Sequence, residues 1–168
     1  MEPGSLSSES PSSESLSIDV AVNAPLWSRP DTAKLTDSQW IEGQLAPVLE
    51  IEGIRAGELS IALVDDEQMA ELNSRYRDKD GPTNVLSFPA SGGLLGDIVL
   101  SYETLAREAE DKNISFGAHM SHLLIHGFLH LQGYDHQTET DAAAMEALEI
   151  TALSKLGIDN PYEKQKMS

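Results

Sequence analysis

Apolar and polar positions along this chain recur with two periods, one typical of strands and one typical of helices. A period of two, or a short apolar run between turn residues, predicts four strands at residues 18–22, 59–64, 85–88 and 96–100. A spacing of three and four residues predicts five helices at residues 37–49, 65–76, 102–111, 116–131 and 138–156. Pro47 is expected to end or kink the first helix, because proline lacks an N–H and its ring clashes with the preceding turn. The order of these elements predicts an α+β fold, with a small mixed β-sheet of about four strands packed with about five helices in a single domain.

The two ends of the chain differ in composition from its centre. Residues 1–15 are rich in Ser, Glu and Pro and contain no aromatic residue, so we expect a disordered tail there. One domain is expected at residues 16–157, followed by a C-terminal tail at residues 158–168. The first 15 residues carry no Lys or Arg and no long apolar segment, which argues against a secretory signal. No run of 18 apolar residues is present, so no membrane span is expected.

Composition narrows the chemistry that this domain can perform. The chain contains no cysteine, which excludes disulfides, thiolate metal sites and cysteine nucleophiles and fits a cytoplasmic protein. Any metal ion must therefore bind His, Asp or Glu. The net charge of −17 opposes contact with a nucleic acid, whose phosphates bind Lys and Arg. Three of the eleven basic residues nevertheless lie within five positions, at Arg75, Arg77 and Lys79, and this segment is where we expect any RNA contact.

All five histidines lie between residues 119 and 136, and four of them share the helix predicted at residues 116–131. His119, His122, His126 and His130 fall within an arc of about 80° on that helix. Side chains four residues apart can converge on one ion. His122 and His130 are separated by about 12 Å along the axis, too far for two bonds of about 2 Å to one centre. The helix therefore supplies a pair of ligands, and a third must come from outside it.

The third ligand is predicted to be His136, which follows the helix after a turn. Gly133 can adopt the left-handed conformation that ends a helix and returns the chain toward it. Three neutral imidazoles with an open fourth position are typical of catalytic zinc. We therefore predict one Zn²⁺ per chain, bound by His126, His130 and His136 in a zincin-like metal-binding helix. His122 is expected to contact a ligand or the substrate, and His119 to be a surface or packing residue.

The spacing of these histidines matches the zinc motif of metzincin proteases, with one departure. Those enzymes carry Glu directly after the first ligand as the general base, whereas this chain carries Gly127. The missing Glu argues against peptide hydrolysis. Glycine inside a helix costs about 1 kcal/mol relative to alanine. Either a close approach of another backbone or of substrate, or tight helix packing, would account for Gly127.

Long motifs in this chain resemble those of the YbeY family of zinc-dependent bacterial endoribonucleases. The resemblance covers about residues 16–157 and is carried by four segments: HGFLHLQGYDH at 126–136, the block LN, YR, KD and PTNVLSFP within 72–89, GDI at 96–98, and IDV at 18–20. It implies a single-strand-specific endoribonuclease that acts in ribosomal RNA processing, at the 3′ end of the small-subunit RNA, and in ribosome quality control. It also implies ribosomal RNA, ribosomal particles and other ribosome-associated proteins as partners.

The same resemblance gives a role to Arg77, because the arginine of the Tyr-Arg motif is functionally important in the family. A guanidinium matches phosphate oxygens bidentately, so Arg77 is the candidate catalytic residue that holds the phosphate. The alternative is a surface arginine that pairs with Asp78 or Asp80. Asp135 could orient a ligand imidazole, handle protons or cap a turn, and Tyr134 is expected to pack.

Two other functions remain open for the domain. The first is a ribosome-associated assembly factor whose zinc is mainly structural. The second is a metal-dependent hydrolase of a non-RNA substrate such as a peptide, against which the missing Glu counts. The open three-histidine arrangement favours catalysis.

Overall fold

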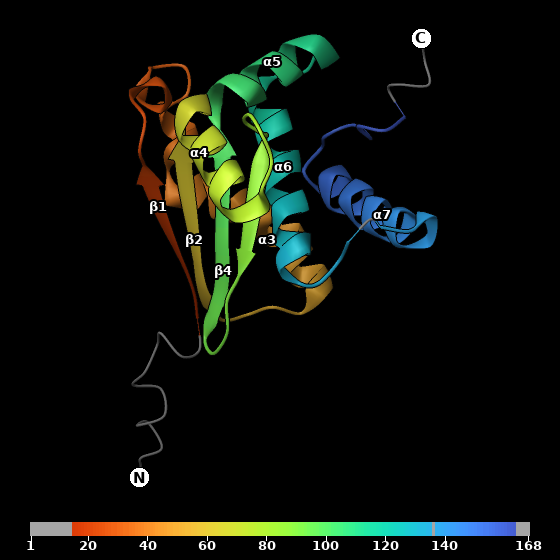
Figure 1. The fold of residues 1–168 in the computed structure, drawn as a ribbon. Helices are drawn as coiled ribbons and strands as arrows, with labels where there is room; N and C mark the ends of the chain where they lie inside the picture. The colour runs from red at the N-terminus through yellow and green to blue at the C-terminus, as the bar shows by residue number, and fades with distance from the viewer. Residues whose placement is uncertain (1–14, 136, 164–168) are drawn as a thin grey trace.

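A four-stranded mixed sheet lies at the centre of the fold (Figure 1). The structure is a computed structural model that describes residues 15–135 and 137–163. This part of the chain contains four strands, two short 3-10 helices and five α-helices. In chain order these are β1 Leu16–Val22, η1 Pro25–Ser28, η2 Ala33–Thr36, α3 Ser38–Glu52, β2 Gly57–Val64, α4 Asp66–Arg77, β3 Val85–Pro89, β4 Leu94–Ser101, α5 Tyr102–Lys112, α6 Phe116–Leu131 and α7 Glu139–Lys155.

The order of the strands in the sheet is β1-β2-β4-β3. β1 pairs parallel with β2, and β2 pairs parallel with β4. β3 and β4 form an antiparallel pair that is joined by a tight connection containing Gly92, whose φ is 73°. Parallel neighbours require a long crossover, and α3 provides it between β1 and β2. The predicted α+β fold with a small mixed sheet and five helices is confirmed.

Alternate residues of the central strands face two different layers. On one face, Ile61 and Ile98 belong to the main core with residues of α3 and α6. On the other face, Val64 and Val99 form a smaller cluster with Met69 of α4. Figure 1 shows α4 across one face of the sheet, with α3 and α6 behind the other. Burial on both faces explains why β2 and β4 are almost continuously apolar.

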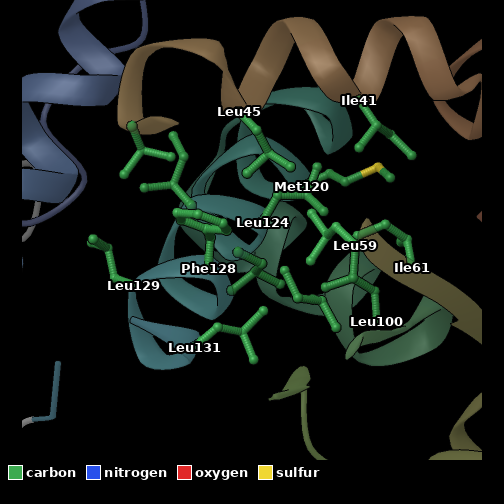
Figure 2. Close-up of a cluster of buried hydrophobic side chains, with 14 of the residues drawn as sticks. Ile41, Leu45, Leu59, Ile61, Leu100, Met120, Leu124, Phe128, Leu129 and Leu131 are labelled. Atoms are coloured by element: carbon green, nitrogen blue, oxygen red, sulfur yellow. The ribbon is translucent and has the colours of Figure 1, made fainter. Parts of the chain in front are cut away.

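The main core holds α6 against the sheet. Met120, Leu124 and Phe128 of α6 are fully buried and lie among Ile41 and Leu45 of α3 (Figure 2). Complete burial of one such side chain stabilises the fold by about 1.5–3 kcal/mol. The helix that carries the histidines is therefore fixed along its apolar side, and its polar side is held in a defined direction.

The expectation that Pro47 ends the first helix is wrong, because α3 continues from Ser38 to Glu52. A proline inside a helix costs about 3 kcal/mol. Ile41, Leu45 and Val48 are each 0% exposed on the buried side of the helix, and their burial outweighs that cost. The helix ends instead at Gly53, which has a φ of 71°.

None of the helices in the described part of the chain has the length and apolar character needed to cross a membrane.

Candidate active site

α6 brings two of the predicted metal ligands together. The helix spans Phe116–Leu131, as predicted, and its first turn is capped by the Ser115 hydroxyl, which accepts a hydrogen bond from the Ala118 N–H at 3.0 Å. The Nε2 atoms of His126 and His130 lie 3.1 Å apart, and their ring centroids are separated by 4.6 Å. His136, the predicted third ligand, lies outside the described residues, and its role stays a prediction.

Hydrogen bonds to the Nδ1 atoms determine how these two rings are protonated. His130 Nδ1 lies 2.9 Å from the backbone carbonyl of Tyr134, which can only accept, so this nitrogen carries the proton. The turn that places this carbonyl depends on Gly133, whose φ is 98° in the left-handed region. His126 Nδ1 lies 2.6 Å from a carboxylate oxygen of Glu149 and donates to it. In the neutral rings, both Nε2 atoms therefore present lone pairs.

Glu149 of α7 is the carboxylate that holds His126. Its side chain is 0% exposed, and its second oxygen lies 2.8 Å from His122 Nε2. The hydroxyl of Tyr162 donates to the same oxygen. Burial alone would raise the pKa of the Glu149 carboxyl, but the hydrogen bonds from His122 and His126 outweigh burial and lower this pKa to about 2. Glu149 is consequently an anion at neutral pH, and its histidine partners are donors.

Sequence reasoning did not identify Glu149 or Tyr162 as functional residues. A signal for Glu149 was present, because it lies on the buried stripe of α7 with Met145, Ala152 and Leu153. A charged residue within an apolar stripe requires a partner. No comparable pattern marks Tyr162, which follows the last helix.

His119 forms a second histidine–carboxylate pair on the other side of the site. It is 2% exposed, and its Nε2 lies 2.8 Å from Glu108 of α5. The same carboxylate accepts a hydrogen bond from the Asn84 amide at 3.0 Å. Burial would raise the pKa of Glu108, but the hydrogen bonds from His119 and Asn84 outweigh burial and lower it. His119 thus contacts a buried partner and holds Asn84 in place through it.

The paired Nε2 atoms fit a zinc site. Two Zn–N bonds of about 2.0–2.1 Å at a tetrahedral angle separate their nitrogens by about 3.3 Å, close to the 3.1 Å between His126 and His130. Two lone pairs facing each other at this distance need a cation between them. No cluster of three His, Cys, Asp or Glu able to hold a metal occurs within residues 15–135 and 137–163. That range contains only two of the three predicted ligands.

A cleft of about 730 Å³ opens beside the two histidines. Its polar lining residues include His126, His130, Asn73, Arg77, Lys79, Asn84 and Asp135. The histidines come from α6, whereas Arg77 and Lys79 come from the end of α4 and the segment after it. The fold therefore joins the predicted metal ligands and the basic segment in one cleft, as a shared site requires.

Arg77 is held at the wall of this cleft by two contacts. Its Nη2 donates a hydrogen bond to the Ser87 backbone carbonyl at 2.5 Å, and its guanidinium carbon lies 5.1 Å from the centre of the Phe88 ring. Within the described residues, no ion pair joins Arg77 to Asp78 or Asp80. Lys79 also lines the cleft. Arg75 instead pairs on the surface with Glu71 at 3.2 Å.

Gly127 is explained by close packing of α6 against the sheet. A Cβ at this position would lie 3.1–3.2 Å from Ile98, Ser87 and Val85. The Ser87 hydroxyl also donates to the Gly127 carbonyl at 2.9 Å. The alternative of tight helix packing is therefore confirmed, and the contact is with the strands that border the cleft.

Gly127→Ala is expected to destabilise the protein by about 1 kcal/mol, because overpacking costs about 1–3 kcal/mol and exceeds the gain of about 1 kcal/mol in helix propensity. Chemical denaturation will measure the change. Gly43→Ala in α3 is the matched control, since a Cβ there meets nothing within 4 Å and only the propensity gain is expected. Equal stabilisation by both substitutions would contradict the packing explanation.

Tyr134 packs and does not expose its ring for stacking. It lies against the main core, and its hydroxyl donates to Glu52 at 3.0 Å. That hydrogen bond, with a smaller effect of burial, raises the pKa of Tyr134. Asp135 lines the cleft beside it.

The fold and the cleft define a small α+β protein with a paired-histidine metal site next to a basic wall. The family model described as endoribonuclease YbeY matches residues 28–157. An endoribonuclease YbeY from Methylocella silvestris is 46% identical over 155 residues, which cover 88% of this chain and 86% of that protein. Another, from Chelativorans sp. (strain BNC1), is 42% identical and covers 90% of this chain and 96% of its own length. The chain therefore belongs to the YbeY endoribonuclease family.

A solved structure has the same fold. The solution structure of TM1509 from Thermotoga maritima aligns with a TM-score of 0.53 at 24% identity and covers 83% of this chain and 91% of its own. The resemblance inferred from the motifs is thus confirmed. Family membership supports an endoribonuclease role, that is, a hydrolase of the nuclease class.

Proposed function

We propose that this chain is a zinc-dependent, single-strand-specific endoribonuclease of the cytoplasm. Its substrate is ribosomal RNA, in maturation of the 3′ end of the small-subunit RNA and in ribosome quality control, and its partners are ribosomal particles and ribosome-associated proteins. The proposal is carried by one observation: the Nε2 atoms of His126 and His130 meet at 3.1 Å in the cleft that Arg77 and Lys79 line. Metal ligands and phosphate-binding groups are thereby within one site.

His126 and His130, together with His136, would hold the zinc ion. When bound, zinc supplies Lewis-acid chemistry, by lowering the pKa of water or by polarising a phosphoryl oxygen. Arg77 binds the scissile phosphate. A guanidinium has five N–H groups, and the bond to the Ser87 carbonyl uses one of them. Lys79 adds a positive charge that helps to bring the RNA backbone into an otherwise acidic protein.

An exposed aromatic ring beside Arg77 supports the preference for single-stranded RNA. Tyr76 is 57% exposed, and its ring packs edge-on against Phe88 with centroids 5.5 Å apart. Unpaired bases can stack on such a ring, whereas paired bases in a duplex are already stacked. Phe88 in turn lies next to the Arg77 guanidinium, so a base and its phosphate can be held by adjacent side chains.

The nature of the cleft disfavours a protease-like reaction. Glu149 is the carboxylate that contacts His126, but it is fully buried and lies on the Nδ1 side of the ring. It therefore does not replace the Glu that proteases carry at the position of Gly127. Among the described lining residues, Asp135 is the carboxylate that faces the cleft.

Removal of the metal is expected to abolish RNA cleavage. The full-length protein is stripped with a chelator, and zinc is then added back while cleavage of a single-stranded ribosomal RNA segment is followed. We expect cleavage to return at one equivalent of zinc, and the same segment annealed into a duplex to be cut more slowly. Full activity in the stripped protein would refute the proposal.

The same preparation distinguishes the two alternative functions. Zinc-dependent cleavage of a peptide, with RNA left intact, would replace the RNA assignment by a hydrolase of a different substrate. Stable zinc binding and retention on ribosomal particles, without cleavage of any RNA, would support an assembly factor with a structural zinc.

A further inference from the structure

A single buried carboxylate connects three separate parts of the chain behind the predicted metal site. Glu149 is 0% exposed in α7, and its two oxygens divide their contacts. One oxygen lies 2.6 Å from His126 Nδ1 of α6. The other lies 2.8 Å from His122 Nε2 and accepts the hydroxyl proton of Tyr162. A buried charge is maintained only where such partners are present.

The contact with His126 fixes both the rotation of its ring and the nitrogen that faces the cleft. With the Nδ1 proton directed at Glu149, the lone pair of Nε2 is directed toward His130, 3.1 Å away. His130 obtains the same orientation from a backbone carbonyl at Tyr134. One predicted ligand is therefore oriented by the helix-ending turn, and the other by a side chain from a different helix.

Tyr162 and His122 hold Glu149 in turn. The Tyr162 ring packs edge-on against His122 with centroids 5.7 Å apart. The segment that carries this tyrosine is itself ordered by Asn160, whose side-chain oxygen accepts from the Tyr162 N–H at 2.8 Å and the Glu163 N–H at 3.2 Å. The match to the family model ends at residue 157, so Tyr162 lies beyond it.

We propose that Glu149 is the positioning residue for the metal ligand His126, and that Tyr162 and His122 brace Glu149 so that the site is pre-organised before metal binds. This inference rests on the metal site of the proposed function. It assigns the segment after α7 a part in building the active site. A carboxylate that accepts from a ligand imidazole fixes its tautomer, raises its basicity and strengthens metal binding.

The test compares zinc affinity in three variants of the full-length protein. Glu149→Gln preserves shape but removes the charge and one acceptor, and zinc affinity is expected to fall by about 10–100-fold. Tyr162→Phe removes one hydroxyl, and a loss of about tenfold or less is expected. Glu139→Gln, an exposed change on the same helix, is the control and should bind zinc as the wild type does. Affinity is measured by competition with a chromophoric chelator.

The absorption spectrum of the Co²⁺-substituted protein provides a readout that a merely structural role would not change. We expect Glu149→Gln to alter the cobalt spectrum, while the metal-free variant binds single-stranded RNA as the wild type does. Wild-type zinc affinity and cobalt spectrum in a folded Glu149→Gln variant would overturn the inference. Should that variant not fold, Tyr162→Phe decides, and wild-type affinity there overturns it.

This design also separates the inference from the proposed function. A wild-type protein that binds zinc but cuts no RNA refutes the endoribonuclease proposal, while the zinc affinities of the variants still decide the role of Glu149. A wild-type protein that binds no zinc overturns both.

Discussion

Replacing either His126 or His130 with alanine is expected to reduce RNA cleavage to background. Each change removes one of the paired Nε2 donors. A catalytic metal supplies several kcal/mol of transition-state stabilisation, and each 1.36 kcal/mol is a factor of ten in rate, so a loss of about 10³-fold or more is expected. Single-turnover cleavage of a labelled single-stranded RNA, with bound zinc determined in the same samples, measures the effect.

The two substitutions differ in a way that makes the comparison informative. His126→Ala also removes a partner from the buried Glu149, so stability is expected to fall by about 1–3 kcal/mol. His130 donates instead to the Tyr134 backbone carbonyl, and its removal leaves Glu149 intact. Loss of cleavage only in His126→Ala would contradict the metal explanation and indicate an effect through Glu149. Gln132→Ala, in the same motif but outside the cleft lining, is the control and should cleave normally.

Elements whose signals lie within a few residues could be predicted from the sequence. α6 is the clearest example, because its apolar spacing, its Ser115 cap and the turn at Gly133 are all local. The same helical spacing predicted that His126 and His130 would converge. Pro47 shows the limit of local reasoning, since burial of the surrounding α3 side chains overrides the cost of proline.

Features that depend on contacts between distant segments could not be predicted. No local pattern indicates that β4 lies between β2 and β3 in the sheet. No spacing links Trp27 to Val64, although the Trp27 indole donates to that carbonyl at 2.9 Å across 37 positions. Such pairings are determined by the packing of the whole core.

The candidate site shows the same division between local and distant signals. Helix geometry excluded a shared ion for His122 and His130, but it could not say what His119 and His122 contact instead. Their partners are carboxylates 11 and 27 residues away, on α5 and α7. The four-histidine stripe of α6 therefore combines two predicted ligands with two residues that fasten neighbouring helices.

The second large effect is expected for Arg77→Ala, which should lower kcat by about 10²–10³-fold, the range for loss of one donor to a developing oxyanion. Zinc affinity should not change, because the described contacts of Arg77 are with Ser87 and Phe88 and not with the histidines. Arg77→Lys should recover only part of the rate, since lysine keeps the charge but not the planar fork. Stopped RNA cleavage reactions across substrate concentrations separate kcat from KM.

Arg75→Ala is the matched control for this prediction, because it removes the same charge two residues away. Arg75 pairs with Glu71 on the exposed side of α4, with side chains 60% and 70% exposed. If the role of Arg77 is to bind the scissile phosphate, its loss should also reduce the salt dependence of RNA binding by about 0.7 per phosphate contact. Equal losses of rate in Arg75→Ala and Arg77→Ala would show that only general charge attraction is involved. A normal rate in Arg77→Ala with zinc bound would remove this arginine from the catalytic machinery and leave the phosphate to Lys79 and the metal.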